Sequence, residues 1–437
     1  MKNNKFKKHI FLLVTFAIIL SCETTLEPNS IIEEEDNIDN PPIVEEETES
    51  IEDTITYYNE SKVSDGLILI NDAAANKVFL MNRNGKTVFD WPLGEERLGN
   101  DAHLLPNGKL LAMLEVPDPK IQLGGFGGKV EIINKKGEKE WSFTYASDNH
   151  ILHHDAQMLP NGNILTMIWE RKSIEESQEA GYSLNVETFP DGLIEIDTTT
   201  NTIVWEWHVW DHLIQENDNT KSNFGEVATN PQLIDINYTT DISGDITHGN
   251  GIAYDPEKDV IYFSSNFYSE IWVIDHSTTS EQAASSSGGT YNKGGDLIYR
   301  FGNPSAYKNQ IGKRLFNNNH FPNLLKEKNT ILVYSNGGDL NRSTVYELEL
   351  ASEFSLTPNA DNEPQVVWTF SNEKLFSPKV SGAVELPNGN ILITEGDFGL
   401  WEVTKEKEII WQYEKNGFYW RAYHYSEQDE SIINLSL

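Results

Sequence analysis

Residues 152–165 read LHHDAQMLPNGNIL, and the architecture can be predicted from this stretch and its copies. A histidine pair opens a strand, a Pro-Asn-Gly turn follows, and an apolar strand returns. The turn recurs in residues 100–108 (NDAHLLPNG) and 381–389 (SGAVELPNG). The histidine and its apolar tail recur in residues 248–254 (HGNGIAY) and 320–325 (HFPNLL). The repetition predicts one hairpin used five times.

Setting the copies in register brings one residue of each to the same place. These residues are Asn100, His154, His248, His320 and Ser381. We therefore predict that the five side chains occupy equivalent positions at strand starts.

A second repeat alternates with the first: an alternating strand, a polar turn, and a strand that usually carries tryptophan. Its six copies span residues 77–91, 130–143, 192–207, 271–301, 345–370 and 400–413. Five follow a histidine-type hairpin, and the first follows a shorter inner strand expected over residues 66–71. Six four-stranded units of roughly 50 residues predict an all-β, six-bladed β-propeller over residues 61–437. The tryptophans are expected to pack between blades.

The N-terminus is predicted to be a targeting signal. Four lysines precede the apolar run 10–20, and Cys22, the only cysteine, follows Ile-Leu-Ser as in a bacterial lipobox. We expect residues 1–21 to be a lipoprotein signal peptide and Cys22 to be lipidated. The acidic segment 22–60 is expected to be a disordered linker. The predicted location is the outer membrane, on its periplasmic or cell-surface face, with the lipid as the only membrane contact.

The net charge of the chain limits the kinds of ligand that it can bind. The chain carries a formal charge of −35 over 437 residues, which argues against nucleic acid as a ligand. An anionic substrate would need a local pocket rich in hydrogen-bond donors or positive charge. A homodimer is compatible with the sequence.

Three histidines on one ring fit two chemistries, because the innermost strands of a propeller line its central channel. The imidazoles could bind a metal ion such as zinc. Alternatively, one histidine could act as nucleophile on an anion while the others act as donors. Asn250 adds an amide two residues after His248, and Asp155 is the one carboxylate at a matching position. This pattern favours the second chemistry, with no metal.

Further motifs carry a family resemblance. They are HGN at 248–250, SSN at 264–266, SEIWVIDH at 269–276, GGDLIYRFGNP at 294–304 and YWRAY at 419–423. Together with the Leu-Pro-Asn-Gly turns, over about residues 65–425, the chain resembles the bacterial arylsulfate sulfotransferase family. The resemblance implies a six-bladed propeller that moves a sulfuryl group between phenols through a sulfohistidine. It also implies no cofactor and no adenosine phosphosulfate donor, and the glycine-rich run 124–130 is not a P-loop.

The resemblance also implies residue roles. His320 matches the nucleophile, and His154, His248 and Asn250 match sulfate-binding residues. Asn266 stands where the family has an arginine, and Arg314 and Arg342 are candidates to replace it only by their nearness in sequence. The predicted catalytic residues are thus His320, His248 and His154, and the predicted substrate-binding residues are Asn250, Asn266, Ser381 and Asn100.

Such a site would resemble one for phosphoryl transfer, with a loose, in-line transition state stabilised by preorganised donors. Neutral His320 would attack sulfur, and protonated His154 or His248 would neutralise the sulfate and protonate the leaving phenolate. Two other hypotheses stay open at this point. One is a non-catalytic surface lipoprotein that binds sulfated or phenolic glycan-associated ligands through the same ring. The other is a metal-dependent hydrolase or lyase.

Overall fold

The computed structural model describes residues 50–437. The signal peptide predicted over residues 1–21, the lipidation site Cys22 and the linker up to residue 49 lie outside the described part. Among residues 50–437, no helix has the length and apolar character needed to cross a membrane.

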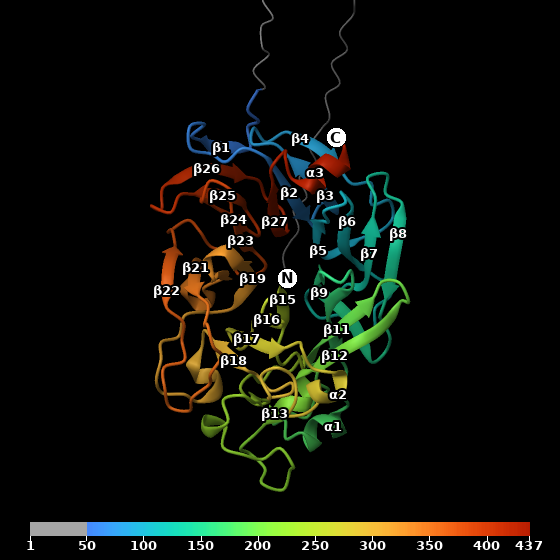
Figure 1. The fold of residues 1–437 in the computed structure, drawn as a ribbon, viewed down its shortest axis with the longest axis vertical. Helices are drawn as coiled ribbons and strands as arrows, with labels where there is room; N and C mark the ends of the chain where they lie inside the picture. Colours follow the sequence, from blue (N-terminus) through green and yellow to red (C-terminus); the bar gives the residue numbers. More distant parts are fainter. Residues whose placement is uncertain (1–49) are drawn as a thin grey trace, which may run out of the picture. The chain divides into compact units, whose positions relative to one another are not determined.

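The described chain forms six antiparallel sheets arranged around a centre (Figure 1). The strands of each blade run in order from the channel outward. The first blade contains β27 (Tyr419–Tyr425), β2 (Leu67–Asp72), β3 (Lys77–Met81) and β4 (Thr87–Asp90). The second contains β5 (Leu98–Leu104), β6 (Leu110–Glu115), β7 (Gly128–Ile133) and β8 (Lys139–Thr144). The third contains β9 (His150–Met158), β10 (Ile164–Glu170), β11 (Asp191–Asp197) and β12 (Thr202–His208).

The other three blades follow the same plan. The fourth contains β15 (Gly249–Asp255), β16 (Val260–Ser265), β17 (Glu270–Asp275) and β18 (Tyr299–Phe301). The fifth contains β19 (Asn319–Leu325), β20 (Thr330–Ser335), β21 (Thr344–Glu349) and β22 (Val366–Phe370). The sixth contains β23 (Gly382–Glu385), β24 (Ile391–Glu395), β25 (Gly399–Val403), β26 (Ile409–Glu414) and, outermost, β1 (Ile55–Tyr58). The predicted all-β, six-bladed propeller is confirmed.

Small elements decorate the loops between blades. The helices are α1 (Ile174–Glu179), α2 (Ser280–Ala283) and α3 (Glu430–Leu435), and β13 (Leu213–Ile214) pairs with β14 (Ile234–Asp235). Single 3-10 turns cover Val209–His212, Val227–Thr229, Pro304–Tyr307, Lys326–Lys328 and Gly338–Leu340.

Both ends of the described chain close the ring, which the repeats did not predict. The inner strand of the first blade is β27 from the C-terminus, and β2 is the second strand. The prediction of an inner strand over residues 66–71 is therefore wrong. At the other closure, β1 pairs with β26, so the linker expected over residues 22–60 overlaps the sixth blade.

The core lies between blades. Central strands such as β16 are buried along their whole length, because neighbouring blades cover both faces. Trp207, Trp272 and Trp411 are among the largest fully buried side chains. The interpretation of these tryptophans as packing residues is confirmed. The inner strands β5, β9, β15, β19, β23 and β27 contact one another in turn around the channel.

Candidate active site

The predicted histidines converge at the end of the channel where the inner strands begin. The rings of His154 and His248 lie 5.1 Å apart between centroids, in an edge-on arrangement. His320 is close enough that the charge of His248 lowers the pKa of both His154 and His320. Three blades thus contribute one imidazole each.

Bulges in the inner strands bring the imidazoles together. The pairing of β9, β15 and β19 with their neighbours shifts beside the histidines. His154 and His248 have left-handed backbones, with φ of 54° and 47°, whereas in β19 Phe321 takes this conformation. The single register predicted from the sequence does not hold, because each strand bulges differently. Strained backbone of this kind is typical of functional sites.

His320 is neutral and has one fixed partner. Its Nδ1 lies 2.6 Å from Oδ1 of Asn336, a side chain that the sequence did not single out. Burial lowers the pKa of His320 to about 3, and the Asn336 hydrogen bond only partly opposes this shift. Because Asn336 Oδ1 can only accept, Nδ1 carries the proton and Nε2 keeps its lone pair. No hydrogen bond engages this Nε2 within residues 50–437.

Among the three histidines, His248 is the one whose pKa is raised. Its Nδ1 lies 2.5 Å from Oδ2 of Asp245, whose other oxygen accepts from the His248 backbone N–H. Burial alone would lower the pKa of His248, but the charge and hydrogen bond of Asp245 outweigh it and raise the pKa. The ring also stacks on Phe267 at 4.7 Å. Of the three imidazoles, that of His248 is therefore the most readily protonated.

His154 contacts a second buried histidine, His153. Its Nδ1 lies 2.9 Å from His153 Nδ1, and His153 Nε2 lies 3.0 Å from Asp191 Oδ1. One of the two Nδ1 atoms donates a hydrogen bond to the other. Burial, together with neighbouring positive charges, lowers the pKa of His154 well below its ordinary value. His154 is therefore neutral.

The glycine-rich loop forms the wall behind His154. A Cβ added to Gly125, whose φ is +94°, would lie 2.1 Å from His154 Cε1. The His154 backbone N–H donates to Gly125 O. The amide of Asn100 donates to the carbonyls of Gly125 and Phe126, so its N–H groups hold the loop. Glycine at position 125 is thus required by close packing.

Asn250 and Asn266 hold the backbone just before His320. Their amides donate to Asn319 O over 2.7 and 3.1 Å. Asn266 Nδ2 also lies 3.4 Å from His320 Nδ1. Ser381, with φ of 88°, donates to Lys379 O and accepts from Gly396 N. Of these predicted substrate-binding residues, Asn250 and Asn266 thus contact the backbone beside His320.

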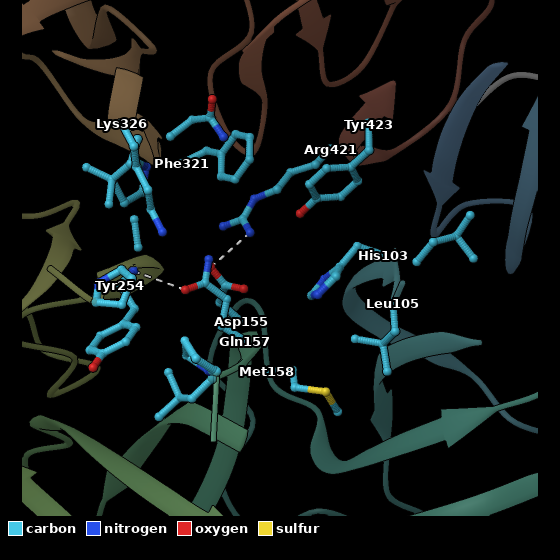
Figure 2. A pocket seen from close by; sticks show the side chains of 18 of the residues that line it. His103, Leu105, Asp155, Gln157, Met158, Tyr254, Phe321, Lys326, Arg421 and Tyr423 are labelled. Atoms are coloured by element: carbon cyan, nitrogen blue, oxygen red, sulfur yellow. Dashed lines mark hydrogen bonds and ion pairs between the residues drawn. The ribbon is translucent and has the colours of Figure 1, made fainter. Parts of the chain in front are cut away.

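Arg421 closes the channel beyond the histidines. Its guanidinium donates to Asp155, Asp101 and Asn250 O, and it lies 4.2 Å over the ring of Phe321. Figure 2 shows Arg421 and Asp155 meeting in a cavity of about 510 Å³ at the other mouth, where the hairpin turns lie. Two carboxylates, Asp101 and Asp155, neutralise this arginine. The sequence motif contained Arg421, but the residues that accept its hydrogen bonds belong to three other blades.

The arginines considered from their nearness in sequence lie on exposed loops. Arg314 donates to Ser269 Oγ at 3.0 Å and to Phe316 O at 2.8 Å, and its guanidinium has no carboxylate within 4 Å among the described residues. Ser269 Oγ also accepts from the backbone N–H of Asn318, whose amide donates to Asn266 Oδ1. Arg314 is therefore linked to Asn266 through Ser269 and Asn318. For Arg342, an exposed residue, the described contacts place no side-chain group in the site.

Within residues 50–437, no group of three or more His, Cys, Asp or Glu side chains is arranged to hold a metal ion. The carboxylate beside His248 binds a ring nitrogen instead, at 2.5 Å.

Comparison with known families identifies the chain. The model of the family described as Arylsulfotransferase (ASST) matches residues 52–430. The chain belongs to the arylsulfotransferase family. Membership indicates aryl sulfotransferase activity in general, on small aryl sulfates and phenols. No curated protein matches the chain.

Solved structures similar to this arylsulfotransferase are distant propellers. The β-propeller domain of Myceliophteria thermophila Cps50 (Swd1) shares 8% identity over 86% of this chain and 97% of its own, with a TM-score of 0.43. A putative 6-phosphogluconolactonase from Bacteroides fragilis NCTC 9343 shares 10% identity over 84% and 100%, with a TM-score of 0.42.

Proposed function

We propose that this arylsulfotransferase carries the sulfuryl group on His320 Nε2, from an aryl sulfate donor to a phenolic acceptor. The observation that supports this most is the pairing of charge states. A neutral imidazole with a free Nε2 lies beside an imidazolium, and each is held by its own buried partner, Asn336 or Asp245. A nucleophile and an acid of this kind are what sulfuryl transfer needs.

The reaction balances with these two residues. The His320 Nε2 lone pair forms a bond to sulfur while the bond from sulfur to the aryl oxygen breaks. The departing phenolate oxygen takes the proton of His248 Nε2. An acceptor phenol then returns a proton to His248 as its oxygen attacks sulfur, which frees His320. Because His154 is neutral, we assign proton transfer to His248.

A single cation is enough for this substrate. An aryl sulfate ester carries one negative charge, and His248 supplies one positive charge at the site. Arg314, which is linked to Asn266 through Ser269 and Asn318, is a second cation and has no carboxylate within 4 Å in the described chain. The replacement of the family arginine by Asn266 is therefore compatible with transfer.

Aromatic side chains beside the histidines offer a surface for the aryl group. Phe267 stacks on His248, and Trp420 lies edge-on to His154 at 5.8 Å. Phe418 packs edge-on to Trp420 at 5.2 Å. All three rings are partly exposed, as a substrate-binding wall requires.

Turnover of p-nitrophenyl sulfate with phenol tests the proposal. We expect nitrophenol release that depends on phenol and disappears in His320→Ala. Without acceptor, mass spectrometry of the His320 peptide should detect one sulfuryl group. His103→Ala is the matched control, because His103 lines the cavity at the opposite mouth. Bound but unreacted p-nitrophenyl sulfate would favour the non-catalytic binding protein, and stoichiometric zinc would favour the metal-dependent enzyme.

We also propose that the enzyme is exported and anchored to the outer membrane through Cys22. The support is the sequence pattern around Cys22. Metabolic labelling with a fatty acid should modify the native chain and leave Cys22→Ser unlabelled. Labelling of both chains would contradict this anchor.

A further inference from the structure

Asn336 follows β20 directly and is fully buried beside His320. Its amide Nδ2 donates to Ser377 O at 2.9 Å and to Val380 O at 3.1 Å. Its backbone is held as well, because its N–H donates to Asn318 O and Ser343 Oγ donates to its carbonyl. Every polar atom of this residue has a partner.

This network fixes which way the amide points. Two carbonyl oxygens can be satisfied only by the NH2 group, so Oδ1 must face His320. Val380 is β-branched and has φ of 48°, a strained conformation that aims its carbonyl at Asn336. An Oδ1 only 2.6 Å from His320 Nδ1 then requires a proton on Nδ1.

Asn266 is the competing partner, and its contact with His320 is much the longer of the two. Its Nδ2 lies 3.4 Å from His320 Nδ1, against 2.6 Å for Asn336 Oδ1. Its Oδ1 accepts from Asn318, and its NH2 donates to Asn319 O. The amide of Asn266 is therefore satisfied elsewhere.

We propose that Asn336 is a positioning residue that keeps His320 in the tautomer with Nδ1–H and a free Nε2. This inference rests on the proposed role of His320. His248 makes the contrast, because it pairs with the carboxylate of Asp245, whereas His320 pairs with the amide of Asn336. A neutral acceptor orients the ring without stabilising the unreactive imidazolium.

The tautomer can be measured without activity. In the full protein labelled with 15N-histidine, the His320 signals, assigned by their loss in His320→Gln, should show a pyrrole-type Nδ1 and a pyridine-type Nε2. In Asn336→Leu the single tautomer should give way to a mixture. A pyridine-type Nδ1 in the native protein would overturn the proposal even if His320 is the nucleophile.

The Asn336→Asp variant tests why His320 is paired with an amide and not with a carboxylate. The carboxylate should stabilise the His320 imidazolium and lower p-nitrophenyl sulfate turnover about 100-fold at neutral pH. Turnover should recover as the pH rises, because His320 then loses its extra proton. Nitrophenolate leaves without an acid, so the high pH does not stop the reaction. Asn336→Leu should lose activity without this recovery, and exposed Asn388→Asp, in a turn at the other mouth, should match the native enzyme. A pH profile of Asn336→Asp that overlays the native one would overturn the proposal. Loss of nitrophenol release in the native enzyme would instead contradict the proposed function.

Discussion

At the residue scale, burial and the partner of each histidine together set its charge. The sequence aligned three like imidazoles, but burial lowers the pKa of His320 and His154, whereas Asp245 overcomes burial and raises the pKa of His248. In the proposed mechanism, the same side chain type therefore serves as acid in one blade and as nucleophile in the next.

His248→Gln tests the acid. The variant should slow turnover of phenyl sulfate by about 10²–10⁴-fold, because phenolate is a poor leaving group that needs a proton. Turnover of p-nitrophenyl sulfate should fall far less. Initial rates for both donors measure the difference. Equal losses would mean that His248 only binds the sulfate. Phe267→Leu, which removes the stacked ring but keeps the acid, should affect both donors alike.

At the element scale, the inner strands bulge where they meet the site, and loops brace them. The loop before β7 is one such brace, held by Asn100 and packed on His154. These contacts are close in space but distant in sequence, because residues 100, 125 and 154 belong to different strands and loops.

Gly125→Ala tests this brace. The added methyl would meet the His154 ring and strain a backbone with φ of +94°. We expect kcat/KM to fall roughly 100-fold, since displacements of about 1 Å in an active site have this effect. Gly124→Ala is the matched control, because nothing lies within 4 Å of its added Cβ. Equal activity of the two variants would contradict the prediction.

At the scale of the whole molecule, ring closure and contacts between blades hold the site together. His276, after β17, lies 2.9 Å from Glu195 of β11 and 2.8 Å from Asp259. Burial alone would lower the pKa of His276, but hydrogen bonds to both carboxylates raise it. Burial alone would raise the pKa of Glu195, but hydrogen bonds from His276, Asn163 and Asn161 lower it to about 2.

The sign of each shift gives a pH window. The contribution of Glu195 is present above its ordinary pKa of 4.5 and is lost as the pH falls toward 2. That of His276 is full below 6.5 and is lost as the pH rises through its raised pKa. Glu195→Gln should thus cost about 1.5–3 kcal/mol of unfolding free energy near pH 6 and less near pH 9, measured by denaturant titration. The exposed Glu140→Gln, as a control, should change the unfolding free energy little at either pH. A loss for Glu195→Gln that does not change with pH would contradict the pairing.

Much of the fold could be predicted because most strands of a blade follow one another in the sequence. Hairpins such as β9 and β10 are adjacent in sequence, and their alternation and turns are readable there. The inner strand of the first blade was not predictable in this way, because Leu67 of β2 pairs with Tyr425 of β27 from the far end of the chain. In the sequence, the segment with Arg421 and Tyr423 was only one more motif. In the structure this segment is β27, the inner strand that closes the ring.

Periodicity and residue type were enough to establish the number of blades, the packing tryptophans and the set of histidines. What each histidine does became visible only in the folded molecule. Protonation depends on burial and on partners such as Asn336 and Asp245, which reach the site from separate loops. No spacing in the chain encodes those contacts, because bulges and ring closure create them when the blades assemble.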